Sequence, residues 1–380
     1  MKEGWEYKEL GKCCEKTTNI NWNNSFSEIA YNYIDLSSVD RENHTITKPQ
    51  IINKTNAPSR AKQIVKSGDV IFATTRPTLR RFCLINADYN NQICSTGFCV
   101  LRPHKTLLPN WIFYNLMCDD FYRYIEPLQK GANYPAVTDK IVKQFQIPIP
   151  ALAEQQQIVS FLDSEFEKID ALKANAETQL QAAKDLFQKA LKEMLTPKDG
   201  WEEKKFGSVC FYNKVQGKWE NMRYIGLEHI EPHTSNLLST ISVNDVESST
   251  FKFDKGDVLY GRLRPYLQKV IIAPFDGCCS TEIFPIKSKE IKNSFLKYWL
   301  LSDKITGIMN ESCSGCRMPR ANMNDFKNVI IQYPQSEEQQ RIADHLDTLS
   351  AKVKQPEKNY NETITLCNDL KQSLLKRIFE

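Results

Sequence analysis

Apolar residues recur every seven positions in the stretch of chain that follows Glu154. Leu162 and Ile169 begin one series at this spacing, and Phe166 begins a second series between them. No glycine or proline occurs between Glu154 and Pro197. Two interleaved apolar series, sustained over about five heptads, are typical of a long helix that pairs with another helix. At about 1.5 Å per residue, such a helix is roughly 60 Å long.

A second pair of apolar series begins at Leu346 and continues close to residue 380. Polar residues weaken this second seam. Pro356 is expected to break or kink the helix near its start, because proline has no backbone N–H to donate. The residues that we expect in the two seams are Leu162, Phe166, Ile169, Leu180 and Phe187 in the first helix, and Leu346, Val353, Ile364, Leu374 and Ile378 in the second.

The two long helices are expected to pair with each other. A single apolar stripe more often packs on its own domain, but here two equal stripes flank a whole domain. Parallel pairing would bring both globular modules to the same end, where they would collide. Antiparallel pairing places one module at each end and generates a pseudo-two-fold axis. We therefore predict an antiparallel coiled coil.

These helices belong to a duplication of the whole chain. Gly131 matches Gly315 at an offset of 184 residues, and the Glu-Gln-Gln triplet at Glu154 matches the triplet at Glu338 at the same offset. A repeat of this length indicates two similar modules rather than a short-period solenoid. The expected domains are a first recognition module at 1–150, a first long helix at 151–197, a second module at 198–334 and a second long helix at 335–380.

Each module combines short strand patterns with helical ones. Residues 69–74 and 257–260 are rich in β-branched and aromatic residues, as strands are. Residues 110–124 and 293–308 carry apolar residues at helical spacing. We therefore predict an α/β (α+β) protein of two similar mixed modules joined by two long helices.

Composition sets the class of protein without selecting a partner. Hydrophobic residues make up 41% and charged residues 25% of the chain, which are globular values. A net charge of +4 neither requires nor excludes nucleic acid. No apolar run is long enough to span a bilayer, and the first residues lack an apolar signal core. We expect a soluble, cytoplasmic protein whose twelve cysteines are reduced thiols.

Signatures of catalysis are missing from the sequence. There is no Gly-rich phosphate loop and no HExxH motif. Cys313 and Cys316 form one CxxC pair, whereas structural zinc needs four ligands. The Asn-Tyr-Pro at 133–135 lacks the second proline of an adenine methyltransferase box. We expect neither a catalytic nor a metal site in this chain.

Basic and polar residues gather at corresponding places in the two modules, after the Gly-Asp-Val strands and in the later glycine loops. Such side chains suit contacts with DNA phosphates, and arginine can also read guanine in the major groove. The variable stretches at 31–66 and 224–253 share little, as two readers of different targets require. The candidate DNA contacts are Arg76, Arg80, Arg81, Lys130, Asn133 and Tyr134 in the first module, and Arg262, Arg264, Tyr266, Lys269, Arg317, Arg320 and Asn322 in the second.

The order of variable module, Pro-x-x-x-Glu-Gln-x-x-Ile helix, variable module and second such helix resembles the specificity subunit of type I restriction-modification systems. The motif stands at 150–158 and 334–342. The resemblance implies that each module reads one half of a split, asymmetric site in double-stranded DNA, while the helices set the spacer. It also implies that two methyltransferase subunits dock on the helices, that restriction subunits with translocase activity can join, and that the protein is bacterial or archaeal.

The resemblance places no cofactor in this chain. S-adenosylmethionine, ATP and Mg²⁺ would belong to the partner subunits. Three alternatives stay open from the sequence: a specificity arm of a related phage-defence or methylation system, a single-chain DNA-modifying enzyme, and a coiled-coil scaffold that binds only proteins.

Overall fold

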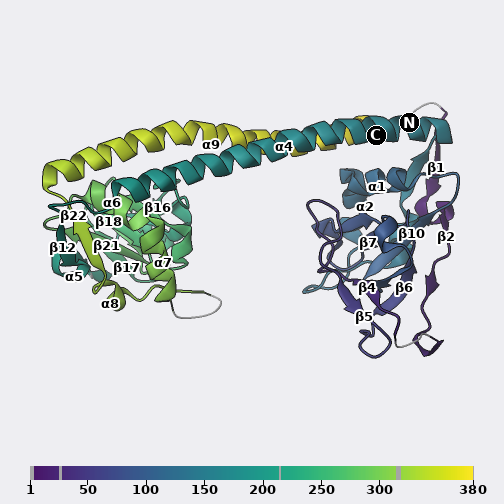
Figure 1. Ribbon diagram of the computed structural model, residues 1–380, viewed down its shortest axis with the longest axis horizontal. Helices are drawn as coiled ribbons and strands as arrows, with labels where there is room; N and C mark the ends of the chain where they lie inside the picture. Colours follow the sequence, from purple (N-terminus) through teal and green to yellow (C-terminus); the bar gives the residue numbers. More distant parts are fainter. Residues whose placement is uncertain (1–3, 25–27, 214, 314–317, 380) are drawn as a thin grey trace. The chain divides into compact units, whose positions relative to one another are not determined.

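The computed structural model describes residues 4–24, 28–213, 215–313 and 318–379. The chain divides into two compact units (Figure 1). Unit 1 comprises Met1–Asn175 and Glu362–Glu380, and unit 2 comprises Ala176–Asn361. Each unit therefore contains one α/β module together with part of both long helices, α4 (Leu152–Met194) and α9 (Ser336–Phe379).

Unit 1 is built on two antiparallel or mixed sheets and a two-stranded ribbon. Helices α1 (Pro109–Met117) and α2 (Asp119–Ile125) pack against the four-stranded sheet, and α3 (Asp139–Gln144) precedes the ribbon. The sheets are β2 (Cys14–Glu15), β10 (Phe98–Pro103), β7 (Val70–Ala73) and β8 (Phe82–Leu84); β3 (Thr18–Asn19), β6 (Ala61–Val65), β9 (Gln92–Ser95), β4 (Tyr31–Ile34) and β5 (Gln50–Ile52); and the ribbon β1 (Glu6–Glu9) with β11 (Gln146–Ile149).

Unit 2 repeats this plan strand for strand. Helices α6 (Asn293–Leu301) and α7 (Asp303–Glu311) correspond to α1 and α2, and α5 (Phe206–Val209) and α8 (Met323–Phe326) are short. The sheets are β13 (Cys210–Tyr212), β21 (Ile283–Ser288), β18 (Val258–Gly261) and β19 (Val270–Ile272); β14 (Gln216–Gly217), β17 (Thr250–Phe253), β20 (Gly277–Ser280), β15 (Arg223–Ile225) and β16 (Ile241–Ser242); and the ribbon β12 (Glu202–Lys205) with β22 (Ile330–Tyr333).

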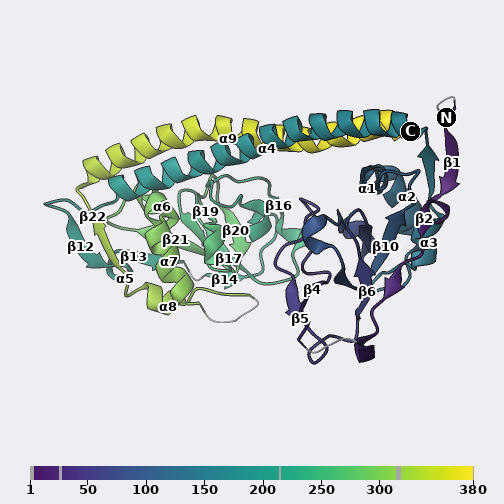
Figure 2. The same cartoon turned by 45° about the vertical axis from the view of Figure 1, so that its right-hand side comes forward.

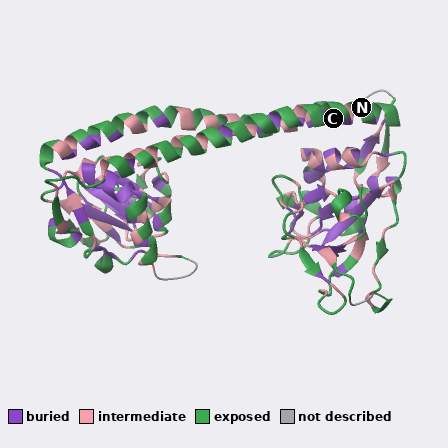
Figure 3. Ribbon diagram, in the orientation of Figure 1, coloured by how far each residue is buried: buried purple, intermediate pink, exposed green. Residues whose placement is uncertain are grey.

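The core of each unit lies between the four-stranded sheet and its helices, where buried residues concentrate (Figure 3). In unit 1, Leu162, Phe166 and Ile169 of α4 are part of this core, with Leu374 and Ile378 of α9 packed against it. In unit 2, Leu346 of α9 is fully buried in the core and Phe187 of α4 packs against it. Leu180 and Ile364 are partly buried, and Val353 is buried. The apolar seams thus pack on the modules as well as on each other.

Within each unit the two helix segments run antiparallel (Figure 2). In unit 1, the Lys371 ammonium pairs with the Asp170 carboxylate at 2.5 Å, and Lys173 donates to the Asn368 side chain at 3.4 Å. The partner number falls from 371 to 368 as the residue number rises from 170 to 173, so the directions are opposite. The predicted antiparallel pairing of α4 and α9 is confirmed inside this unit.

The expected break at Pro356 is wrong, because α9 is a continuous helix from Ser336 to Phe379 with the proline inside it. Proline removes one backbone hydrogen bond of the helix interior. Packing of an amphipathic face supplies most of the stability of a helix in a protein, and α9 buries residues on both sides of the proline, Val353 and Cys367 among them. Tertiary packing therefore offsets the loss at one position.

Two predicted single helices are each divided in two. Residue Cys118 separates α1 from α2, and Ser302 separates α6 from α7, with extended backbone at both positions. The Ser302 hydroxyl donates to the Trp299 carbonyl at 2.8 Å. Serine side chains that bond nearby backbone groups compete with the helix ladder. The apolar periodicity continues across both breaks, which is why the sequence pattern predicts one helix.

The Glu-Gln-Gln triplets anchor the start of each long helix. The Gln155 amide donates to the carbonyls of Thr106 and Pro150 at 3.1 and 3.0 Å and accepts from the Leu108 N–H at 3.0 Å. Gln339 makes the corresponding three bonds in unit 2. Both glutamine residues are buried, at 0% and 1% exposure. Because buried polar groups need partners, this clamp fixes the exit of each helix from its module.

Candidate nucleic-acid interface

The Gly-Asp-Val strand of each unit leads into a one-turn 3₁₀ helix, at Pro77–Leu79 in unit 1 and Pro265–Leu267 in unit 2. We call residues 74–81 with the loop 130–137 turn 1, and residues 262–269 with the loop 318–322 turn 2. In each turn, the two residues that flank the 3₁₀ helix have positive φ. They are Arg76 and Arg80 in turn 1, and Arg264 and Gln268 in turn 2, with φ between 46° and 54°.

The glycine loop holds each turn through the backbone. The Arg76 N–H donates to the Pro135 carbonyl at 2.6 Å, and the Arg264 N–H donates to the Pro319 carbonyl at 2.8 Å. A non-glycine residue with positive φ is uncommon and persists where its surroundings determine it. The same strained backbone in both units thus presents an exposed arginine at the same place.

Turn 1 brings Arg76, Asn133 and Tyr134 together. The Arg76 guanidinium lies over the Tyr134 ring, 4.9 Å from its centroid, and donates to the Asn133 carbonyl at 3.4 Å. Tyr134 is 70% exposed, whereas the ring of a tyrosine is usually partly buried against other side chains. Lys130 is exposed beside this group and pairs through its backbone with Ala136. An arginine, a lysine and an exposed ring together suit contact with nucleic acid.

The other two arginines of turn 1 have intramolecular partners. Arg80 forms an ion pair with Asp119 at 2.5 Å and lies over the Tyr122 ring at 4.2 Å. Arg81 donates from its guanidinium to the Leu36 carbonyl. These contacts tie turn 1 to α2 and to the variable stretch, so both residues position the turn in this conformation.

Turn 2 exposes Arg264 and Tyr266, with Tyr266 47% exposed. Among the residues that the structure describes, no side-chain hydrogen bond or ion pair engages the Arg264 guanidinium. The predicted residue Arg317 lies outside the described residues. Arg264 and Tyr266 are therefore the side chains of this turn that are most accessible to a ligand.

Arg262 and Arg320 share one carboxylate. Glu282 accepts from Arg262 at 3.0 Å and from Arg320 at 2.9 Å. The pair of arginines lines a hollow of about 370 Å³ together with Asn322. One carboxylate between two guanidinium groups leaves the cluster with a single net positive charge. Each guanidinium has five N–H donors, and each gives its Nε–H to Glu282. The remaining N–H groups of the cluster are those that could bind a phosphate or a base edge.

Two further candidates of turn 2 have structural roles here. The Lys269 ammonium donates to the Leu227 carbonyl at 2.6 Å, and burial lowers the pKa of this lysine. The Asn322 side chain accepts from the Asn324 N–H at 3.0 Å and so caps α8. Both residues stabilise the surroundings of turn 2 in this structure.

Glu282 was missed from the sequence, although a comparison of the repeats contains the signal. The first module carries Thr74, Gly97 and Ala136 where the second carries Arg262, Glu282 and Arg320, as the matching backbone bonds show. The three charged residues are therefore present or absent as a set. Residues that change together in this way indicate contact.

Metal-binding clusters, one buried thiol and helix length can be assessed in the described parts of the chain. No group of three or more His, Cys, Asp or Glu side chains there could hold a metal ion. Burial raises the pKa of the Cys83 thiol to about 12, so this thiol is protonated at neutral pH. No helix in the described residues is long and apolar enough to cross a membrane.

The doubled module and the paired helices match known proteins. The family described as Type I restriction modification DNA specificity domain matches residues 2–182 and 198–366. The chain belongs to this family. The specificity-subunit resemblance carried by the Glu-Gln-Gln helices, and the fold of two α/β modules joined by long helices, are thereby confirmed.

Members of the specificity-domain family are similar along different shares of the chain. The Escherichia coli type I restriction enzyme EcoDI specificity subunit is 26% identical over 289 residues, covering 66% of this chain and 65% of its own length. A solved chain from work on complex assembly and conformational transition of the type I R-M system is 26% identical, with a TM-score of 0.76, covering 99% of this chain and 97% of its own. The HsdS subunit from Thermoanaerobacter tengcongensis is 26% identical with a TM-score of 0.53, covering 100% and 97%.

Proposed function

We propose that the chain is the DNA-specificity subunit of a type I restriction-modification system and that each unit reads one half of a two-part DNA site. One observation carries the proposal. Arg76 and Arg264 occupy the same strained turn in the two units, each fixed by a proline carbonyl. Their neighbours differ, with Tyr134 beside one and the Arg262–Glu282–Arg320 cluster near the other. A repeated frame with different surroundings suits two different half-sites.

The chemistry of the turns supports DNA as the ligand. Arginine can bind phosphate oxygens or read guanine through two parallel hydrogen bonds. An exposed tyrosine next to an arginine adds a surface on which a base or a sugar can pack. Backbone contacts would set the register of the DNA, and base contacts would set the sequence.

In this proposal the chain contributes recognition rather than catalysis. Similar proteins carry the name of specificity subunits of restriction enzymes, which supports a recognition role; methyl transfer and cleavage would then belong to other subunits. Two methyltransferase subunits, using S-adenosylmethionine, would dock on α4 and α9, and restriction subunits using ATP and Mg²⁺ would join them. The paired helices would set the spacer between the half-sites, and the complex would work in the cytoplasm.

The test uses the full chain assembled with its methyltransferase subunits and a duplex that contains the complete site. Arg76→Ala and Arg264→Ala should each weaken binding by about 5- to 150-fold if the arginine reads a base, since a bidentate contact is worth about 1–3 kcal/mol. Each variant should relax discrimination in one half-site only. If the contact is to phosphate, the affinity should fall equally on all sequences and the salt slope should fall by about one.

Arg123→Ala is the matched control, because Arg123 is an exposed arginine of α2, away from both long helices and 61% exposed at its side chain. It should leave both half-sites unchanged. Loss of discrimination in both halves from one arginine variant would contradict the assignment of one half-site to each unit. Methylation of DNA by the isolated chain with S-adenosylmethionine would support a single-chain enzyme instead. Absence of any DNA binding would leave a protein-only scaffold.

A further inference from the structure

The two ribbons at the starts of the long helices differ at one edge. In an antiparallel pair, residues alternate between positions that bond the neighbouring strand and positions whose N–H and C=O groups point away from it. The Phe206 N–H donates to the Val329 carbonyl at 2.8 Å. The register pairs Lys205 with Ile330 and Glu203 with Gln332. These two pairs are therefore non-bonded, so the backbone groups of Ile330 and Gln332 point away from β12.

Unit 1 closes the equivalent edge at one of its two positions, and does so in two ways. Pro148 occupies the position that corresponds to Gln332 and has no N–H. Its carbonyl accepts from the buried Trp111 indole at 2.8 Å. Phe295 replaces Trp111 in unit 2, and its side chain has no N–H to donate. Among the described residues, no hydrogen bond reaches the backbone N–H or C=O groups of Ile330 and Gln332 on this side.

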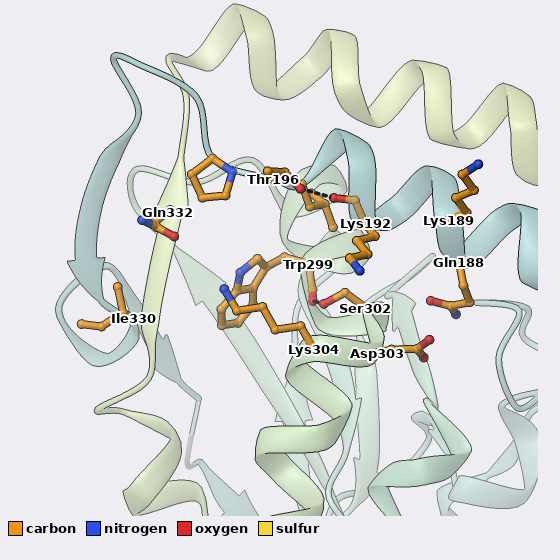
Figure 4. Close-up of a pocket in the computed structure, with 12 residues that line it drawn as sticks. Gln188, Lys189, Lys192, Thr196, Trp299, Ser302, Asp303, Lys304, Ile330 and Gln332 are labelled. Carbon is orange, nitrogen blue, oxygen red and sulfur yellow. Dashed lines mark hydrogen bonds between the residues drawn. The ribbon is translucent and has the colours of Figure 1, made fainter.

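The open edge of β22 adjoins a hollow of about 760 Å³. In Figure 4, Trp299 and the end of α4 lie on one side of β22 and β12 lies on the other. The floor includes Leu195, Trp299 and Ile330, and Ile330 is 44% exposed. Unit 1 carries the larger Phe379 in place of Leu195, buried against Trp111 at a centroid distance of 5.0 Å. Phe379 therefore occupies in unit 1 the place beside the module that the smaller Leu195 takes in unit 2.

The charge around the hollow is positive. Lys189, Lys192 and Lys304 line it (Figure 4). In the described part of the chain, neither Lys192 nor Lys304 forms an ion pair, and Lys189 lies 4.0 Å from Glu193. Unit 1 has Asp120 in the place of Lys304. The free edge, the apolar floor and the lysines therefore lie together at one site.

We propose that β22 binds an extended peptide segment of a protein partner as a third strand, with apolar side chains in the hollow and acidic side chains against the lysines. Strand addition takes its affinity from backbone hydrogen bonds and its specificity from alternate side-chain pockets. Bonds to Ile330 and Gln332 would satisfy the four free backbone groups. β12, with two glutamates and two lysines, carries the charges that protect an edge strand, whereas β22 does not.

Duplex DNA fits this site less well than a peptide. A phosphate backbone would engage the lysines but could not pair with the strand edge or fill the apolar floor. The site is therefore assigned to a peptide, and DNA is an outcome of the test.

The probe is a fluorescein-labelled, capped eight-residue peptide of alternating valine and glutamate, titrated into the full-length chain. Saturable binding is expected, with slower amide exchange at Ile330 and Gln332. Gln332→Pro, which introduces the residue that unit 1 carries, should weaken binding at least about fivefold, the worth of one backbone hydrogen bond. Gln332→Thr keeps the N–H and should bind as the unchanged chain does. Lys304→Asp should weaken binding at low salt, and less at high salt, whereas Lys255→Asp should not.

Two altered peptides complete the experiment. A peptide with lysine in place of glutamate, and one with alternate amides N-methylated, should both bind weakly. The proposal is overturned if binding of the valine–glutamate peptide does not saturate, or if Gln332→Pro binds that peptide as well as Gln332→Thr does. It is also overturned if a duplex oligonucleotide displaces the valine–glutamate peptide and binds less tightly to Lys304→Asp than to the unchanged chain. Specific DNA binding should be the same in Gln332→Pro as in the unchanged chain, so this result separates failure here from failure of the DNA assignment.

Discussion

Replacement of Gln339 by alanine tests whether the glutamine clamp holds α9 to its module. The side chain is 1% exposed and accepts from the Lys292 N–H at 2.7 Å, while its amide donates to the carbonyls of Pro334 and Glu290 at 2.9 and 3.4 Å. Alanine leaves one buried N–H and two carbonyls without these partners. An unsatisfied buried donor costs about 1–3 kcal/mol, and carbonyls add less. We expect Gln339→Ala to lower the free energy of unfolding by about 2–4 kcal/mol.

Urea unfolding measures the total loss, and hydrogen exchange locates it. The Lys292 amide, at the start of α6, should exchange faster in Gln339→Ala than in the unchanged chain. Gln340→Ala is the matched control, because among the described residues the Gln340 side chain bonds only Asp344, one turn along the exposed face. It should change the free energy of unfolding by less than about 0.5 kcal/mol. Equal effects of the two substitutions, or an unchanged Lys292 amide, would refute the clamp.

Three other predictions concern two carboxylates, Asp347 and Glu282, and the proline inside α9. Burial alone would raise the pKa of Asp347, but hydrogen bonds from Lys297 and Tyr298 outweigh it and hold this pKa below its ordinary value. The unchanged chain should therefore be more stable than Asp347→Asn, with the full difference above pH about 4. Urea unfolding repeated at lower pH should show this difference shrinking. Glu282→Gln frees two arginines, so DNA affinity at low salt should rise and the salt slope should steepen by up to about one. Pro356→Ala should raise the melting temperature seen by circular dichroism, because alanine restores a helix hydrogen bond and removes the clash of the proline ring, which together are worth up to about 3 kcal/mol.

The long helices and the two-module plan follow from the sequence because their signals are repeated. The heptad series around Leu162 and Leu346 and the matched Glu-Gln-Gln triplets indicate paired helices on duplicated modules. The heptad series and the matched triplets do not predict that Gln155 and Gln339 are buried. A glutamine at a helix start is usually exposed, and its burial here depends on carbonyl groups from loops 49 residues away in the sequence.

The candidate site is predictable in its location but not in its contacts. The basic stretch after each Gly-Asp-Val strand does form an equivalent turn in both units. The partners that engage Arg80 and Arg81, the Asp119 carboxylate and the Leu36 carbonyl, come from distant parts of the chain. Folding alone brings them together. Composition cannot distinguish such an arginine from the exposed Arg76.

The central claim, that each unit reads its own half of the site, is tested most directly by exchanging one module. Residues 1–150 would be replaced by the matching module of another family member, and the methylated sequences of cells that carry the assembled system would be determined. We expect one half-site to change to that of the donor, while the other half-site and the spacer stay the same. Changes in both half-sites, or in neither, would contradict the account.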